Sequence, residues 1–137
     1  MYRKYFIAVA LFAFASLGFA QEIKYQLSSH ILDITQEKPA ANVEIRLSKQ
    51  DENGDWTIVD SKYTDANGRI QDFLKAEELV DHKGVYKLTY FVESYFAKLN
   101  QSTFYPFIEV VFEIKDDKHY HVPITLSPFG YSTYRGN

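Results

Sequence analysis

Apolar and polar residues alternate along almost the whole chain after residue 22. A period of two is typical of β-strands that bury one face against a core. In the clearest example, Tyr86, Leu88, Tyr90 and Val92 would all point the same way. The alternation predicts seven strands, over residues 23–34, 43–49, 56–63, 69–74, 84–93, 108–115 and 119–126. Seven or eight short strands at this spacing indicate an all-β protein built as a two-sheet β-sandwich.

Residues that favour turns separate the predicted strands. Residues 51–55 and 65–68 each contain an Asn-Gly pair, which tolerates the positive φ angles of tight turns. Residues 38–41 contain a proline and predict a further turn. Residues 94–100 break the alternation and predict one short helix, with Ser94 as its N-cap.

The composition fits a single folded domain. The chain has 137 residues, of which 46% are hydrophobic and 17% aromatic, so a substantial core of β-structure is expected. The formal net charge is −3 and no basic stripe is present, which argues against a nucleic-acid partner. Because the chain has no cysteine, an exported form would depend on its core or on oligomerisation rather than on disulfides.

The first twenty residues have the pattern of a secretory signal peptide. Arg3 and Lys4 precede an uncharged, mostly apolar stretch that ends in Gly18-Phe19-Ala20, with small residues where a signal peptidase cleaves. A membrane anchor is the alternative, but the stretch is shorter than the roughly 20 residues of a spanning helix. We therefore expect residues 1–20 to be removed. Residues 21–137 would then form one secreted or periplasmic domain that is not attached to a membrane.

Histidines are the first candidates for chemistry. His119 and His121 lie two positions apart in a predicted strand, so their side chains share a face. The pair could bind zinc if a third ligand, such as His30 on another strand, joined it. The same spacing also fits a polar sheet face without function. Taken singly, His30 is typical of a hydrogen-bonded structural residue, Arg69 of a solvated arginine, and His82 of a polar loop.

Residues 128–137 have an unusual composition for a chain end. They contain three aromatic residues, one arginine and two glycines. A disordered tail is normally polar and poor in aromatic residues. We therefore expect this segment to pack against its own sheet, against another subunit or against a ligand.

Several segments together resemble one known family. Residues 119–123, His-Tyr-His-Val-Pro, and residues 126–136, Leu-Ser-Pro-Phe-Gly-Tyr-Ser-Thr-Tyr-Arg-Gly, look like the C-terminal signature of 5-hydroxyisourate hydrolases, also called transthyretin-related proteins. Residues 29–33, Ser-His-Ile-Leu-Asp, resemble the family's Gly-His-Val-Leu-Asp. Residues 64–69, Thr-Asp-Ala-Asn-Gly-Arg, resemble its Thr-Asp-x-x-Gly-Arg. The resemblance covers residues 23–137 and implies a transthyretin-like sandwich.

The resemblance implies an enzyme of purine (urate) degradation. Its reaction is the hydrolysis of 5-hydroxyisourate to 2-oxo-4-hydroxy-4-carboxy-5-ureidoimidazoline, without a cofactor or a metal. His30, Arg69 and His121 stand at the family's catalytic positions. Hydrolysis needs a base for the water and a proton for the departing nitrogen, and histidine suits both roles near neutral pH. The planar cation of Arg69 suits an anionic edge of the purine-derived substrate.

The terminal motif and the assembly follow from the same resemblance. The motif places four residues at the substrate: Tyr134, Arg135, Gly136 and Asn137. Asn137 replaces the serine that is usual in the family, and asparagine is bulkier but can still hydrogen-bond. The resemblance also implies a homotetramer, a dimer of dimers, with active sites at the dimer–dimer interface.

Three alternatives belong to other functional classes. They are a non-catalytic periplasmic transthyretin-like carrier of small molecules, a zinc-binding module, and a structural sandwich domain of a cell-surface assembly. Transthyretin, the hormone carrier that shares the fold, lacks the terminal Tyr-Arg-Gly motif and the catalytic histidines. Their presence in this chain favours the enzyme over the carrier.

Overall fold

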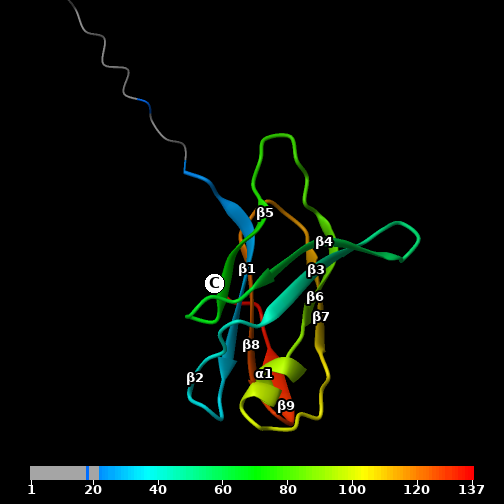
Figure 1. Ribbon diagram of the computed structural model, residues 1–137. Coiled ribbons are helices and arrows are strands. Elements are labelled where there is room, and N and C mark those ends of the chain that lie inside the picture. The colour runs from blue at the N-terminus through cyan, green and yellow to red at the C-terminus, as the bar shows by residue number, and fades with distance from the viewer. Residues whose placement is uncertain (1–17, 19–21) are drawn as a thin grey trace, which may run out of the picture.

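The chain forms two β-sheets that face each other, with one short helix at one end of the sandwich (Figure 1). This computed structural model describes Gly18 and residues 22–137, so the predicted signal peptide lies outside the described residues except for Gly18. The two sheets and the single helix of the described part confirm the predicted fold class. Among residues 22–137, no helix has the length and apolar character needed to cross a membrane.

The first sheet is built around two strands that are far apart in the sequence. It contains β1 (Tyr25–Asp33), β2 (Lys38–Pro39), β5 (Arg69–Lys75), β8 (Tyr120–Ser127) and β9 (Gly130–Thr133). β1 and β8 run parallel at its centre. β5 and β2 pair antiparallel with the other side of β1, and β9 pairs antiparallel with β8. The centre of this sheet therefore depends on long-range pairing.

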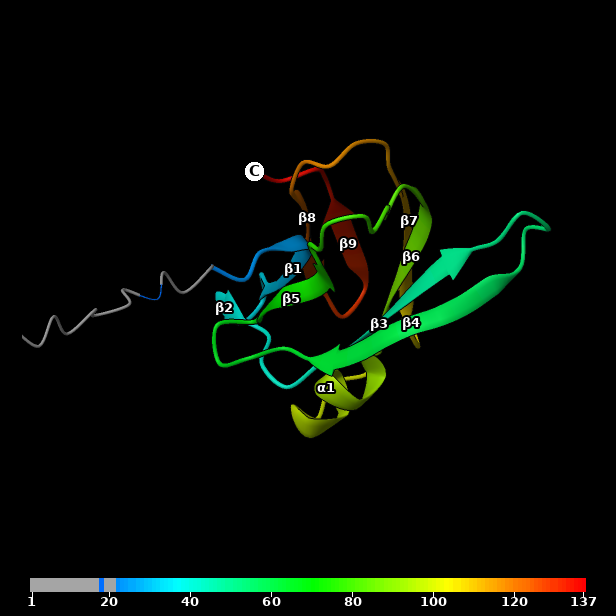
Figure 2. The ribbon, with the colours of Figure 1, turned by 90° about the horizontal axis from the view of Figure 1, so that it is seen from above.

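The second sheet consists of four antiparallel strands in the order β4-β3-β6-β7. Their bounds are β3 (Glu44–Gln50), β4 (Trp56–Tyr63), β6 (Gly84–Tyr90) and β7 (Ile108–Ile114). The β3–β4 hairpin extends away from the rest of the sandwich (Figure 2). As predicted, its turn uses a glycine with positive φ, because Gly54 has a φ of 84°.

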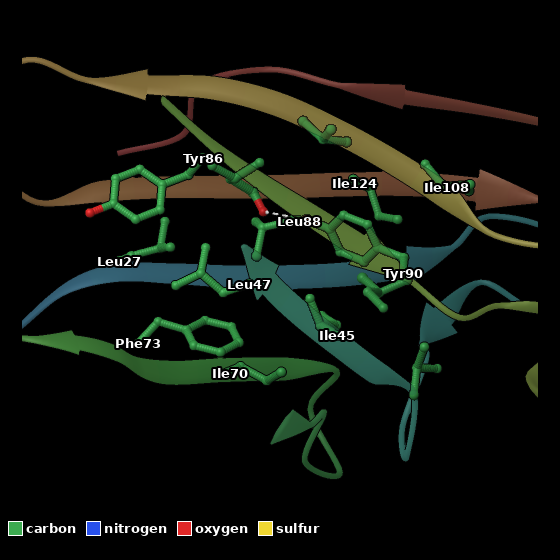
Figure 3. Packing of buried hydrophobic residues seen from close by; sticks show 14 of the residues in the cluster. Leu27, Ile45, Leu47, Ile70, Phe73, Tyr86, Leu88, Tyr90, Ile108 and Ile124 are labelled. Carbon is green, nitrogen blue, oxygen red and sulfur yellow. Dashed lines mark hydrogen bonds between the residues drawn. The ribbon is translucent and has the colours of Figure 1, made fainter. Parts of the chain in front are cut away.

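The core lies between the two sheets (Figure 3). Tyr86, Leu88, Tyr90 and Val92 are almost completely buried, as the alternation predicted. Each fully buried side chain of this size stabilises the fold by about 1.5–3 kcal/mol relative to an exposed one. Successive side chains of a strand point to opposite faces, so in β1, β5 and β8 the residues next to the inward-facing ones point away from the core.

One polar contact crosses this core. Ser29 of β1 is fully buried, and its hydroxyl donates a hydrogen bond to the Val122 carbonyl at 2.8 Å. The Tyr90 hydroxyl of β6 lies 2.8 Å from the same Ser29 oxygen. Burial raises the pKa of Tyr90 well above its ordinary value, so the phenol keeps its proton and can donate it to Ser29. The contact ties the second sheet to the centre of the first.

The helix α1 (Glu93–Lys98) follows β6. Its N-cap is Val92, which makes no side-chain hydrogen bond to the helix, so the predicted cap at Ser94 is wrong. Val92 is buried in the core and already has helical φ and ψ angles of −88° and −15°, so the helix begins at Glu93 and Ser94 lies within its first turn. The Tyr95 hydroxyl donates a hydrogen bond to Asp33 Oδ2 at 2.8 Å and ties the helix to the end of β1.

Two segments that the alternation did not assign to strands join the first sheet. Residues 130–133 form β9 against β8, so the aromatic tail packs on its own sheet, one of the three possibilities left open. Lys38 and Pro39 pair with the end of β1, so the first half of the predicted turn at 38–41 belongs to the sheet. Proline is tolerated in β2 because this short strand lies at the sheet edge.

Candidate active site

His30 and Arg69 lie side by side on the outer face of the first sheet. Ser29 and Ile31 are fully buried, so the alternation of β1 turns Ser28 and His30 to the opposite face. The antiparallel register of β1 and β5 places His30 directly opposite Arg69. Two residues that are ordinary when taken singly therefore become neighbours.

The turn before β5 positions Arg69. Gly68 has a φ of 70°, and a Cβ at this position would lie 2.6 Å from the Ile31 carbonyl oxygen, so the turn requires glycine. The Gly68 carbonyl accepts a hydrogen bond from the Ile31 amide at 2.9 Å. Asp65 Oδ1 accepts one from the Arg69 amide at 3.0 Å. These contacts hold the start of β5 against β1 and keep Arg69 beside His30.

His121 reaches the same outer face from the other side of β1. The parallel register places His121 opposite Ser28, two residues before His30. Ser28 Oγ lies 2.7 Å from His121 Nδ1 and 2.9 Å from His119 Nε2. His119 Nδ1 in turn lies 2.9 Å from the Tyr25 carbonyl oxygen. The His121 ring is therefore held by Ser28, which is itself hydrogen-bonded to His119.

The tail contacts His121 through Gly136. The Gly136 amide donates a hydrogen bond to the His121 carbonyl at 2.8 Å. A Cβ at Gly136 would lie 2.5 Å from Cδ2 of the His121 ring, so the absence of a side chain permits this approach. The neighbouring Arg135 points elsewhere, with its guanidinium 4.3 Å from the centre of the Tyr120 ring. The structure therefore joins Gly136, but not Arg135, to the histidines.

A cavity of about 350 Å³ lies next to the tail, between β7 and the pair β8–β9. His121, Tyr134 and Arg135 line one side of it. His30 and Arg69 do not line this cavity and lie on the more open sheet face. Asn137 is exposed and forms no hydrogen bond with residues 22–137. One chain thus supplies a face of the candidate site rather than a closed pocket.

The surroundings lower the pKa of both histidines. Burial is the largest cause of the lowered pKa of His30, and the nearby charge of Arg69 lowers it further. For His121, burial again contributes most to the lowered pKa, followed by the charges of Arg69, His30 and His119. A neutral imidazole can accept a proton, so both rings are suited to act as bases near neutral pH.

The arrangement of the histidines differs from that of a zinc site. Both ring nitrogens of His119 are already hydrogen-bonded, to Ser28 and to the Tyr25 carbonyl, so neither is free to bind a metal ion. In the described part of the chain, no three histidine, cysteine or acidic side chains are grouped as metal ligands. The arrangement is better suited to proton transfer than to metal binding.

Ser28 is the residue of this site that the sequence patterns did not single out. Its position two residues before His30 indicates only that it shares a face with that histidine. Its contact with His121 depends on the parallel pairing of β1 with β8, which local patterns do not predict. The available signal was that His30 and His121 both face outward from separate strands, because a polar residue on the same face, such as Ser28, can then contact one of them.

Comparisons with known proteins agree with this geometry. Residues 27–136 match the profile of the HIUase/Transthyretin family. A probable 5-hydroxyisourate hydrolase of Caenorhabditis elegans is 46% identical over 112 residues, which are 81% of each chain. The 5-hydroxyisourate hydrolase of Salmonella dublin is 43% identical, over 81% of this chain and 80% of that protein. The mouse (Mus musculus) 5-hydroxyisourate hydrolase is 37% identical, over 81% and 94%.

Solved structures show the same relationship at the level of the fold. Sea bream transthyretin, crystallised in complex with thyroxine, superposes with a TM-score of 0.74 at 30% identity. The match covers 81% of this chain and 94% of the sea bream chain. Both the sequence profile and these relatives span most of the described sandwich. The chain therefore belongs to the HIUase/Transthyretin family.

Proposed function

We propose that this chain is a hydrolase that converts 5-hydroxyisourate to 2-oxo-4-hydroxy-4-carboxy-5-ureidoimidazoline. Relatives from a nematode, a bacterium and a mammal are named for hydrolysis of 5-hydroxyisourate. The observation that carries the proposal is the grouping of His30, Arg69 and His121 on one outer face. Lowered histidine pKa values beside an arginine suit a site that binds an anion and activates water.

The reaction adds water across an amide bond of the substrate ring. A histidine accepts a proton from the water as the water oxygen attacks the amide carbon. The ring C–N bond then breaks, and the proton is delivered to the departing nitrogen. His30 and His121 act jointly in these transfers, which accelerate such reactions roughly 10²–10⁴-fold. Arg69 binds the anionic edge of the substrate or the oxygen on which negative charge develops.

The tail completes the site in this proposal. Gly136 lies against the His121 ring, and Tyr134 lines the adjacent cavity, so both are suited to contact the substrate. Arg135 lines the same cavity and would border the bound molecule. Asn137, exposed next to Gly136, supplies a hydrogen-bonding side chain where the family usually has serine.

We place the working site in a homotetramer, a dimer of dimers. The open sheet face with His30 and Arg69 supports this assignment, because a second subunit would exclude water from it. Exposed aromatic side chains such as Phe104 and Phe129, 72% and 71% exposed, are available for subunit contacts. Light scattering after gel filtration is expected to give the mass of four chains, and the mass of one chain would contradict this assembly.

We also propose that the protein is secreted or periplasmic. The support is the signal-peptide pattern of residues 1–20, with cleavage after Ala20. Intact mass spectrometry of protein exported under its own leader is expected to find a chain that begins at Gln21. Retention of the leader, or recovery of the protein only inside the cell, would contradict the proposal.

The deciding experiment follows the decay of freshly generated 5-hydroxyisourate by ultraviolet absorbance. The protein is expected to accelerate the decay, while His30→Ala and His121→Ala fall towards the spontaneous rate. Circular dichroism checks that the variants remain folded, and His82→Ala serves as the control because His82 contacts the Lys75 carbonyl outside the site. Decay at the spontaneous rate with the unaltered protein would instead favour a small-molecule carrier.

A further inference from the structure

Ser28 links two histidines on the outer face of the first sheet. Its side chain is on the face of His30 and His121, yet the residue is only 8% exposed. Its oxygen lies 2.7 Å from His121 Nδ1 and 2.9 Å from His119 Nε2. Both distances are typical of strong hydrogen bonds, and a hydroxyl can donate only one of the two.

The Tyr25 carbonyl determines the direction of these hydrogen bonds. A carbonyl oxygen only accepts, so His119 Nδ1, at 2.9 Å from it, carries a proton. In neutral His119 the other nitrogen, Nε2, then accepts the hydroxyl hydrogen of Ser28. The Ser28 oxygen is left to accept a hydrogen bond from His121 Nδ1. The reverse direction would require a second proton on His119.

A neutral histidine carries only one proton on its ring nitrogens. Because that proton is on Nδ1 in His121, its Nε2 is unprotonated. Nε2 has no hydrogen-bond partner within residues 22–137, and it is not among their completely buried unpaired atoms, so part of its surface remains accessible. Gly136 lies next to Cδ2, the ring carbon bonded to Nε2, and presents no side chain there. The unprotonated nitrogen therefore points to where a water or substrate molecule can approach.

We infer that Ser28 and His119 are positioning residues that keep the His121 proton on Nδ1 and present Nε2 as a base. This inference rests on the proposed hydrolysis for its catalytic consequence, but not for the hydrogen-bonded arrangement itself. When Nε2 takes a proton from water, His121 becomes a cation. Its bond to Ser28 then becomes charge-assisted and stronger, which stabilises that cation until Nε2 returns the proton to the departing nitrogen.

The first test measures the tautomer directly, without substrate. Nitrogen-15 NMR of the histidine rings at a pH where they are neutral is expected to find His121 protonated on Nδ1 and unprotonated on Nε2. In Ser28→Ala this preference is expected to be lost, because Nδ1 has no acceptor. A proton on Nε2 of His121 in the unaltered protein would overturn the inference.

The second test measures rates. Ser28→Ala is expected to lower kcat by about 10–100-fold, because small displacements of reacting groups cost up to about 10²-fold, with a smaller change in KM. Ser28→Thr keeps the hydroxyl and is expected to restore most of the loss. Ser48→Ala is the matched control, because Ser48 is also buried but lies in the second sheet. Thermal unfolding checks that all three variants are folded.

The two tests separate this inference from the proposed function. An unaltered kcat in Ser28→Ala, with active protein, would overturn the positioning role. If the unaltered protein does not hydrolyse 5-hydroxyisourate but NMR finds the Nδ1 tautomer, the proposed substrate is wrong and the hydrogen-bonded chain stands. Equal losses in Ser28→Ala and Ser28→Thr, with unchanged tautomers, would indicate packing rather than positioning.

Discussion

The outer faces of the two sheets carry similar residue types but arrange them differently. Each face presents cations beside other polar groups. On the second sheet, the Arg46 guanidinium lies 4.8 Å from the centre of the Phe91 ring, and 4.0 Å from Glu44. Lys87 Nζ lies 4.5 Å from the centre of the Trp56 ring. Both cations are therefore already paired with an acidic side chain or an aromatic ring of the same face, Lys87 with Glu109 as well as Trp56.

Arg69 on the first sheet has different neighbours. Within the described residues it forms no ion pair, and the groups that respond to its charge are His30 and His121. A cation beside two partly buried bases has no compensating negative charge in the isolated chain, but it can stabilise a bound anionic substrate. Arg69 therefore differs from the cations of the second sheet in what surrounds it: its positive charge lies beside two histidines whose pKa it lowers.

The largest expected effect is the loss of hydrolysis rate when Arg69 is replaced, and Arg46 on the second sheet provides the matched control. Arg69→Gln is expected to lower kcat/KM for 5-hydroxyisourate about 10²–10³-fold, the range found when one donor to a developing oxyanion is lost. Arg46→Gln removes a cation from the other sheet and is expected to leave the rate unchanged. The absorbance assay measures both. A loss of activity in Arg46→Gln similar to that in Arg69→Gln would remove the distinction between the two faces.

Local alternation was sufficient to predict most of the strands and the two-sheet fold class, though not which strands pair. The strands, the Asn-Gly turns and the buried row of β6 depend on short-range patterns and on burial of one face. The predicted end of β6 was wrong for a physical reason. Val92 continues the alternation and is buried, but the backbone has already turned towards α1. Burial alone does not distinguish a strand from the turn that follows it.

The site was less predictable than the fold because it depends on long-range register. The family resemblance pointed to His30, Arg69 and His121, but the roles of Ser28 and His119 follow from parallel pairing between β1 and β8. Those strands are about 90 residues apart, and the period-two pattern carries no information about which strands pair. The composition of the tail likewise leaves three possible partners open, and only the pairing of β9 with β8 decides among them.

The next largest loss of activity is expected from adding a side chain at Gly136, with Gly130 in the same C-terminal segment as the control. A Cβ at Gly136 would meet the His121 ring at 2.5 Å, whereas the nearest atom to a Cβ at Gly130 is Ser127 Oγ at 3.8 Å. Gly136→Ala is therefore expected to displace the ring and lower kcat/KM roughly 10–100-fold, as small displacements of catalytic groups do. Gly130→Ala is expected to keep normal activity. Equal activity in both variants would show that the tail does not position His121.

The smallest effect, and the most specific, is on the pH dependence of the two histidines. Burial, and then Arg69, lower the pKa of His30 and His121 below the ordinary 6.5, so both rings stay neutral at more acidic pH than a free histidine. Because a base must be unprotonated, the acid limb of kcat/KM is expected to have its midpoint below 6.5.

A cation on the second sheet provides the control for the effect of Arg69 on this titration. Removing a neighbouring positive charge makes protonation easier, so Arg69→Gln is expected to raise the pKa of both histidines towards the ordinary value. Lys87→Gln, on the second sheet, is expected to leave both unchanged. NMR titration of the ring C–H signals measures the shifts in both variants without depending on the reduced rate. An upward shift in both variants would mean that net charge, rather than the unpaired Arg69 beside the histidines, sets their protonation.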